Sequence, residues 1–245
     1  MERQRVLAVL GMVIGTMTTP AMAQTFQSND FITWSQIGWS NLGTQVGQDF
    51  DTVFAATGDL MEIGIHGSAG NSIIFDDPKD VVAFLPATFP AGVLTSDLLD
   101  PAVSPAGAYG GEVVALTLNV AFSDAGLLKG NINLPFGDLV LKGLTGDLAF
   151  ANGLSVRQVL ADANTVVGGG AEPNSSVTLT DMFTLTNDID MSFNGGPVSS
   201  FATQNFVYPT TTVSAPEIDP AIMSGPAMLL IGALAVVRGR RIRMA

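Results

Sequence analysis

The stretch GEVVALTLNVAF, residues 111–122, decides which kind of secondary structure dominates this chain. Apolar residues at every second position fit one face of a strand: Leu116, Leu118, Val120 and Phe122. A second set, spaced three or four residues apart, fits one face of a helix: Val113, Leu116 and Val120, with Thr117 as a less regular member. Length and propensity do not separate the two, so the sequence leaves this segment open between helix and strand.

Other segments indicate strands more clearly. Apolar and polar residues alternate over residues 61–65 and over residues 183–193, where the pattern is broken only at Asn187. Two further short strands are predicted at residues 72–75 and 138–141. We therefore expect more strand than helix in this part of the chain.

Two helices are predicted from their N-terminal caps. A Ser-x-x-Gln capping box at Ser155 opens a helix that runs to Val167 and stops at three glycines. Asp77 caps a shorter helix that has Pro78 in its first turn and continues through Phe84. Together with the strands, these helices predict a mixed α+β fold that is rich in strand.

Composition excludes several classes of protein. The chain has 245 residues, of which 47% are hydrophobic and 13% charged, with one His and no Cys. The absence of Cys excludes disulfides, thiolate metal sites and Cys nucleophiles. Residues 24–214 carry 4 basic and 19 acidic side chains, a net charge of −15 that argues against nucleic acid as a partner. We expect one globular domain over residues 24–209, large enough to bury a core.

The first 23 residues have the pattern of a secretory signal peptide. Arg3 and Arg5 precede an apolar run over residues 6–14, and Ala21 and Ala23 form a small-x-small cleavage site. The run is shorter than the roughly 20 residues that span a membrane, which argues against an uncleaved anchor. We predict export, with signal peptidase cutting after Ala23.

The other end of the chain has the pattern of a transmembrane helix. Residues 221–237, AIMSGPAMLLIGALAVV, contain no charge and reach about 25 Å as a helix, close to the roughly 30 Å of a hydrocarbon core. The basic tail, residues 238–245, holds a stop-transfer cluster: Arg238, Arg240, Arg241 and Arg243. Positive charge resists translocation, so we expect this tail in the cytoplasm and the body outside the inner membrane.

The residues before that helix resemble the PEP-CTERM sorting signal of exopolysaccharide-producing bacteria. Residues 210–220 form a polar linker and the motif, which is similar to the Pro-Glu-Ile-Asp-Pro variant: Pro216, Glu217, Ile218, Asp219 and Pro220. The resemblance implies that an exosortase-like membrane enzyme removes the tail. The body would then be released to the cell surface or the surroundings, with exopolysaccharide as a further candidate partner.

The body is itself similar to a recurrent module of exported bacterial proteins. The likeness lies in AYGGEVVALTLNVAFSDAG, followed by FGDLVLKGLTGDLAFANGLSVRQVLADANTVVGGG. In that module a Leu-Asn-Val segment precedes a Leu-x-x-Gln-Val-Leu type helix that ends in glycines. The similarity spans roughly residues 31–170. It implies a single module of unassigned function and transfers no catalytic residue.

Hydrolase chemistry finds little support in the sequence. HGSAG, residues 66–70, is superficially similar to the Gly-x-Ser-x-Gly nucleophile elbow, but His66 takes the place of the first glycine and no helix is signalled after Ser68. We therefore favour a turn with His66 on a polar face. A glycosidase would need two carboxylates flanking a sugar cleft, and the sequence does not single out a pair. Trp34 and Trp39 are expected to pack in the core rather than stack on sugars.

Metal sites are limited to hard cations. One His and no Cys leave too few zinc ligands. Asp188, Asp190 and Ser192 have the spacing of the first three ligands of a calcium loop, but Phe193 and Ser199 replace the required Gly and Glu. Alternation in this segment instead predicts that the aspartates face solvent. We expect no cofactor and leave calcium open.

These observations favour an exported, non-enzymatic envelope or extracellular-matrix protein that is processed through its C-terminal sorting signal. Two alternatives stay open. One is a secreted polysaccharide-active hydrolase, for which paired carboxylates in a deep cleft would be the evidence. The other is a calcium-dependent adhesion module.

Overall fold

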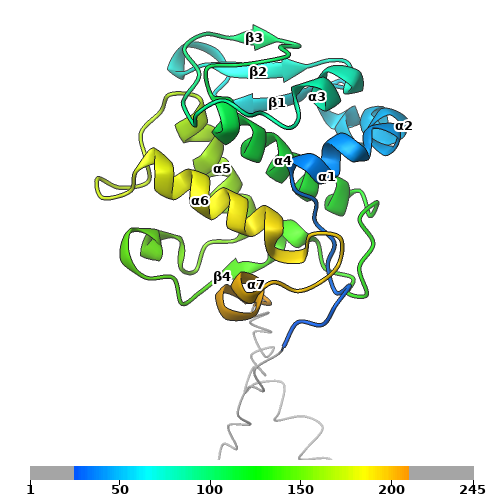
Figure 1. Ribbon diagram of the computed structural model, residues 1–245, viewed down its shortest axis with the longest axis vertical. Helices are drawn as coiled ribbons and strands as arrows, with labels where there is room; N and C mark the ends of the chain where they lie inside the picture. The colour runs from blue at the N-terminus through cyan, green and yellow to red at the C-terminus, as the bar shows by residue number, and fades with distance from the viewer. Residues whose placement is uncertain (1–24, 210–245) are drawn as a thin grey trace, which may run out of the picture. The chain divides into compact units, whose positions relative to one another are not determined.

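Helix α4 (Gly107–Asp124) runs through the middle of the domain, and it includes the whole of the segment that the sequence left open (Figure 1). Almost every residue of α4 is buried, so the helix has no polar side to give it an amphipathic period. Helices α5 (Val156–Val167) and α6 (Leu179–Asp190) pack against α4. This three-helix contact organises the rest of the fold.

The computed structural model describes residues 25–209. The predicted signal peptide, the linker and sorting motif at 210–220, the transmembrane helix at 221–237 and the basic tail at 238–245 therefore lie outside the described residues. The same holds for the functional residues assigned to them: Ala21, Ala23, Pro216, Glu217, Ile218, Asp219, Pro220, Arg238, Arg240, Arg241 and Arg243. Within residues 25–209, no helix is both long enough and apolar enough to cross a membrane.

A three-stranded sheet lies at one end of the domain (Figure 1). Strands β1 (Met61–Gly64) and β2 (Ser72–Phe75) pair antiparallel, with Met61 opposite Phe75, and β3 (Leu98–Leu99) adds to β2 in parallel. The strands predicted at residues 61–65 and 72–75 are confirmed. The order β1-β2-β3 leaves β1 and β3 at the edges, and the sheet packs over α4 and α5 through β1.

The remaining elements are short and complete the two ends of the domain. Strand β4 (Val140–Leu141) pairs antiparallel with β5 (Phe206–Val207) at the end opposite the three-stranded sheet. The strand predicted at 138–141 begins later than expected, because Phe136–Asp138 forms a 3₁₀ turn. The other helices are α1 (Gln36–Asn41), α2 (Gly43–Phe54), α3 (Pro78–Phe84) and α7 (Ser200–Asn205), and the other 3₁₀ turns are Ala55–Thr57, Gly67–Ala69, Gly146–Ala151 and Met191–Phe193.

The strand predicted at 183–193 is wrong, because this segment is helical. Thr178 and Asp181 form a capping box that opens α6, and the helix continues into the 3₁₀ turn Met191–Phe193. The buried residues Met182, Leu185 and Ile189 are spaced three and four apart, which is one face of a helix. The strand-rich prediction fails with it: 49% of the described residues are helical and 9% are in strands. The coarser prediction, a mixed α and β domain, holds.

Both helices predicted from their caps are confirmed. Ser155 accepts a hydrogen bond from the backbone of Gln158, whose side chain caps Ser155 in return, and α5 ends at Val167 as expected. The Asp77 side chain accepts from the backbone N–H of Lys79 at the start of α3. These caps satisfy N–H groups that a helix cannot pair internally.

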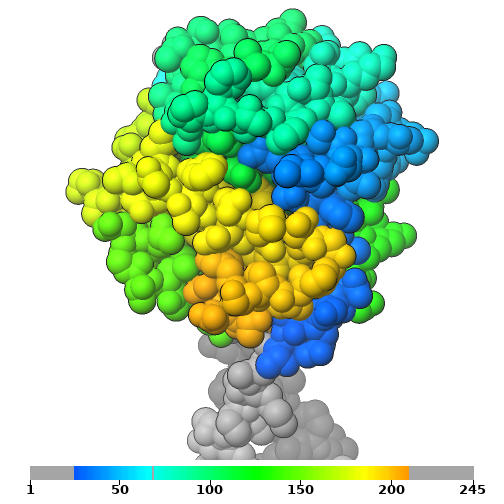
Figure 2. Space-filling view, in the orientation of Figure 1, coloured from blue at the N-terminus to red at the C-terminus, as the bar shows by residue number. Residues whose placement is uncertain are grey.

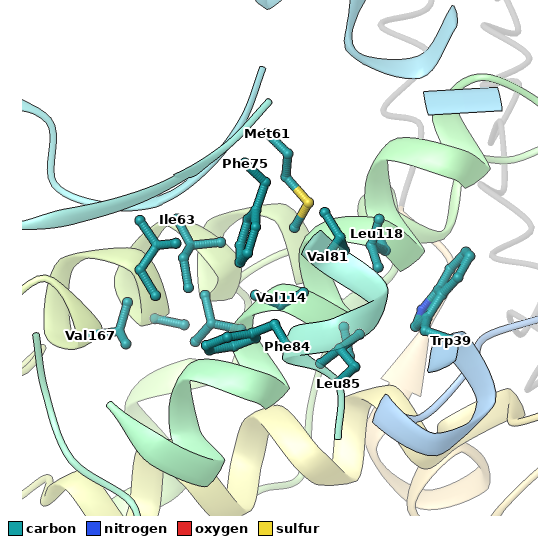
Figure 3. Close-up of a cluster of buried hydrophobic side chains, with 14 of the residues drawn as sticks. Trp39, Met61, Ile63, Phe75, Val81, Phe84, Leu85, Val114, Leu118 and Val167 are labelled. Atoms are coloured by element: carbon teal, nitrogen blue, oxygen red, sulfur yellow. The ribbon is translucent and has the colours of Figure 1, made fainter. Parts of the chain in front are cut away.

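The larger of two hydrophobic clusters lies between the sheet and the helices (Figure 3). Ile63 and Phe75 from the sheet meet Val114 of α4 and Phe84 of α3 there. Trp39 is fully buried in this cluster, next to Phe122 at 5.0 Å between ring centroids, and Trp34 packs against it. The expectation of core packing is confirmed for Trp39, and Trp34 is partly buried against the same cluster.

The second cluster is aromatic and lies toward the end where the described chain enters and leaves the domain. Phe193 is at its centre, with ring centroids 5.5 Å from Phe26, 5.1 Å from Phe31 and 6.1 Å from Phe206. Tyr208 stacks on Phe26 with 4.8 Å between ring centroids. Side chains near the two ends of the described residues are therefore in direct contact.

Replacing Phe193 with Ala should destabilise the domain by about 3–5 kcal/mol, because it leaves a cavity among four aromatic rings. Urea unfolding followed by the fluorescence of Trp34 and Trp39 measures the change. Phe89, which is 54% exposed, is the matched control, and Phe89→Ala should alter stability by no more than about 0.5 kcal/mol. Equal losses for the two variants would show that Phe193 is not at the centre of a packed cluster.

Candidate functional site

A pocket of about 500 Å³ opens between α1, the segment at residues 86–87, α4 and the end of α6. Its polar lining residues are Ser35, Gln36, Glu112, Asn187 and Asn194. Its apolar lining residues are Ile37, Pro86, Ala87 and Met191. Figure 2 shows the region of α1, in blue, and the end of α6, in yellow, side by side on one face of the molecule.

A buried polar network supports this pocket from the inside, and Asn119 of α4 is at its centre. Asn119 is fully buried, and its Oδ1 accepts from the backbone N–H of Trp34 at 2.7 Å and from Trp39 Nε1 at 3.2 Å. Its Nδ2 donates to the backbone oxygen of Trp34 at 2.9 Å and to Asp190 Oδ1 at 2.8 Å. One carboxamide therefore joins the start of α1, the middle of α4 and the end of α6.

Asp190 and Glu112 form a carboxyl pair next to this amide. Asp190 is fully buried, and its Oδ2 has no hydrogen-bond donor within residues 25–209. Burial first, and then the negative charge of Glu112, raise the pKa of Asp190 well above its ordinary value. Burial and the neighbouring Glu112 thus both favour the protonated, uncharged form of Asp190.

Glu112 connects the network to the pocket. It is 7% exposed and is one of the lining residues, whereas Asp190 is not. Glu112 Oε1 accepts from Gln36 Nε2 at 2.7 Å. Burial raises the pKa of Glu112, and the hydrogen bonds from Gln36 and Asp190 oppose that rise because they stabilise its carboxylate form.

Local sequence explains how Gln36 reaches Glu112. The Ser35 hydroxyl accepts from the backbone of Gly38 as the N-cap of α1, which places Gln36 in the first helical turn. The Gln36 Oε1 accepts from the backbone N–H of Ala87 at 2.9 Å. A Cβ at Gly111 would collide with this oxygen, so α4 can approach Gln36 only with glycine there.

The end of α6 is fixed by Thr33. Its hydroxyl donates to the backbone oxygen of Asp190 at 2.6 Å and accepts from the backbone N–H of Phe193 at 3.2 Å. Thr33 is fully buried, so both bonds are shielded from water. They hold the turn Met191–Phe193, which carries Met191 at the pocket and Phe193 in the aromatic cluster.

The pair does not have the geometry of a glycosidase. Glycoside hydrolases place two carboxyl groups about 5–5.5 Å or about 6.5–9.5 Å apart, on either side of the scissile bond. Asp190 and Glu112 are in direct hydrogen-bonding reach, and Asp190 has no exposed surface. Of these two carboxyl groups, only Glu112 can touch a molecule in the pocket, so the arrangement suits binding of a hydrogen-bond donor.

The residues weighed for a serine hydrolase lie elsewhere. His66 precedes the 3₁₀ turn Gly67–Ala69, as the turn interpretation predicts. The His66 side chain is 78% exposed, and its Nδ1 is 2.9 Å from Glu62 Oε1. Neither His66 nor Glu62 lines the pocket.

The residues weighed for calcium lie on a helix, not a loop. Asp188 and Asp190 belong to α6, and the Ser192 hydroxyl donates to the backbone oxygen of Asp188 at 2.8 Å. The prediction that these aspartates face solvent is wrong for Asp190, which turns inward to Asn119. Among the described residues, no three side chains of the types His, Cys, Asp and Glu are grouped to hold a metal ion.

Sequence reasoning missed the central residues of the site, although a signal for two of them was present. Glu112 and Asn119 are, apart from Thr117, the polar residues of GEVVALTLNVAF, and they are seven positions apart, on one side of a helix. Gln36 carried no such signal, because its partner Glu112 is remote in the sequence and no motif links the two.

Comparison with known proteins adds no relative, since no family model, curated protein or solved structure matches this chain.

Replacing Asp190 with Asn should remove part of the pH dependence of stability. The pKa of Asp190 is higher in the folded than in the unfolded protein. Its contribution to the free energy of unfolding is therefore complete below the unfolded pKa of about 4 and is lost as pH rises through the folded pKa. Asn keeps an acceptor for Asn119 and a donor for Glu112 without titrating. The free energy of unfolding, measured with urea between pH 4 and pH 8, should therefore fall less steeply with pH for Asp190→Asn than for wild type.

Two further variants complete this test. Asp190→Ala removes both hydrogen bonds and should cost about 1–3 kcal/mol for each partner left unsatisfied, at every pH. Asp147→Asn changes the same charge at an exposed position and should keep the wild-type pH profile. Parallel profiles for wild type and Asp190→Asn would contradict a protonated Asp190.

Proposed function

We propose that this chain is an exported, non-enzymatic envelope or extracellular-matrix protein, sorted through its C-terminal PEP-CTERM-like signal. The observation that supports this most is the contact between the two ends of the described residues. Phe26, the third residue after the predicted cleavage site, and Tyr208, which precedes the predicted linker, stack on each other. The compact unit ends at Tyr208. The folded domain thus fits the interval between the two predicted signals.

Contact between the ends of the domain suits a tethered body. Tyr208 Oη donates to Asp30 Oδ2 at 3.4 Å, and the backbone N–H of Asn29 donates to the oxygen of Gly196 at 2.8 Å. These bonds hold the entering chain against the leaving chain. A tail attached after Tyr208 can therefore be kept or cut without opening the domain.

The carboxyl geometry favours a binding role over hydrolysis. A secreted polysaccharide-active hydrolase needs two carboxyl groups that both reach the substrate. Here the second carboxyl, Asp190, supports Glu112 from behind and is closed to the pocket. We therefore assign the pocket to ligand binding within the exported body.

Export predicts a mature chain that begins at Gln24. Small side chains at Ala21 and Ala23 fit the signal-peptidase site, so the N-terminal mass of protein recovered outside the cytoplasm should lack residues 1–23. Ala23→Asp should block the cut, whereas Ala23→Gly should not. Recovery of exported wild-type protein with residues 1–23 still attached would refute the assignment of a cleaved signal.

The tail should separate anchoring from processing. Leu230→Asp with Leu234→Asp places two charges in the predicted membrane helix at about 2.5–3.5 kcal/mol each, so the body should leave the membrane fraction with its tail uncut. Pro216→Ala with Glu217→Ala should instead leave an uncut body in the membrane fraction. Immunoblotting of membrane and soluble fractions measures both.

Matched controls make this result specific. Leu230→Val with Leu234→Val keeps the helix apolar and should behave as wild type. If the Asp and Ala variants both fractionate and migrate like wild type, the tail is not a sorting signal.

A further inference from the structure

We propose that the pocket at Glu112 binds the ammonium group of a primary alkylamine. This inference concerns the folded domain alone and does not depend on how the chain is sorted. It is carried by three observations: a buried carboxyl group without a cationic partner, a large exposed apolar pair beside it, and an unused amide at the same pocket.

The charge of the pocket is one-sided. No Lys or Arg is among the lining residues, and Glu112 is in no ion pair within residues 25–209. Arg157 forms its ion pairs away from the pocket, with Asp124 and Asp138. A carboxylate held away from water is stabilised by a cation with good hydrogen-bond geometry. An ammonium group supplies both the charge and the donors.

The apolar rim of the pocket favours a ligand whose ammonium group is attached to an alkyl chain. Ile37 is 62% exposed and Met191 is 42% exposed, although both are large hydrophobic side chains. They belong to different elements, α1 and the turn after α6, and they line the same pocket with Pro86. An alkyl chain between them would remove apolar surface from water on both sides.

The pocket also offers a second acceptor. The Asn187 side chain makes no hydrogen bond within the described part of the chain, and it lines the pocket. Asn194 is engaged through Oδ1, which accepts from the backbone N–H of Ser35 at 3.2 Å. The Asn187 amide oxygen is therefore free to accept from an ammonium that is already held by Glu112.

A primary amine fits better than a metal ion or a neutral alcohol. A metal ion would need several oxygen ligands, and the pocket presents one carboxylate. A neutral alcohol would leave the charge of Glu112 without a counter-ion. The net charge of −15 over residues 24–214 also favours arrival of a cation over that of a neutral or anionic ligand.

Titration calorimetry of the purified full chain in detergent at pH 7 tests the proposal with n-butylammonium chloride. We expect saturable binding of n-butylammonium and at least tenfold weaker binding of 1-butanol, which has the same length without the charge. Glu112→Gln keeps the shape of the side chain and should weaken n-butylammonium binding at least tenfold. Glu172→Gln removes the same charge from an exposed position and should leave binding unchanged.

A second variant tests the rim without disturbing the core. Ile37 is exposed, so the Ile37→Ser variant should fold normally. It should weaken the binding of n-butylammonium roughly threefold or more and leave the binding of methylammonium unaffected. Nα-acetyl-lysine amide carries the same ammonium on a peptide-like body. Binding as tight as that of n-butylammonium identifies a protein lysine as the source of the ligand, and much weaker binding identifies a free amine.

Several outcomes would overturn the proposal: no binding of n-butylammonium by folded wild type, equal binding of 1-butanol, unchanged binding by Glu112→Gln, or displacement of the amine by calcium chloride in a Glu112-dependent way. Failure of this test leaves the sorting proposal standing, because that proposal is decided by cleavage and fractionation. Equally, tail variants that fractionate as wild type would leave amine binding untouched.

Discussion

The buried carboxamide of Asn119 is the interaction on which the arrangement of the central helices depends. All of its hydrogen-bonding partners come from other elements: Trp34 and Trp39 at α1, and Asp190 at the end of α6. A buried amide costs stability unless its groups are paired, so α1, α4 and α6 must be in place together. The pocket is a consequence of that requirement, because its walls are these same elements.

Polar groups also give α4 a defined rotation. Apolar residues are buried all around its middle, and apolar contacts alone would tolerate several rotations of the helix with similar burial. Glu112 and Asn119 remove that freedom, since Glu112 must meet Gln36 while Asn119 meets Trp34. Buried polar groups have been found to specify one arrangement in some proteins, and we place this pair in that class as a hypothesis. The Asp190 variants measure how much this buried polar network contributes to the free energy of unfolding.

Predictions from the sequence succeeded where the controlling hydrogen bonds were local. The caps at Asp77 and Ser155 act on N–H groups two or three residues away, so a short motif was enough to place α3 and α5. Strand β1 was found because it buries every second residue, whereas β2 is buried on both sides and was recognised as a short apolar run. In these elements tertiary packing agrees with local preference.

Predictions failed where the spacing of apolar residues fits both a helix and a strand, or fits neither. Leu185, Ile189 and Phe193 are spaced by four, which fits both a strand face and a helix face, and the capping box at Thr178 was the deciding signal that the alternation obscured. Segment 111–122 gave no answer because a helix buried on every side lacks an amphipathic period. The raised pKa of Asp190 comes from its burial and from Glu112, which is remote in sequence and adjacent in the fold, so no pattern in either segment could predict it.

The turn Met191–Phe193 links the pocket to the aromatic cluster. Met191 lines the pocket and Phe193 anchors the aromatic cluster, so the pocket is joined to the place where Phe26 and Tyr208 meet. Within residues 25–209, the two hydrophobic clusters and the pocket are built from side chains of one compact unit. The proposed amine site therefore takes its lining from the described domain and none of it from the proposed sorting signal.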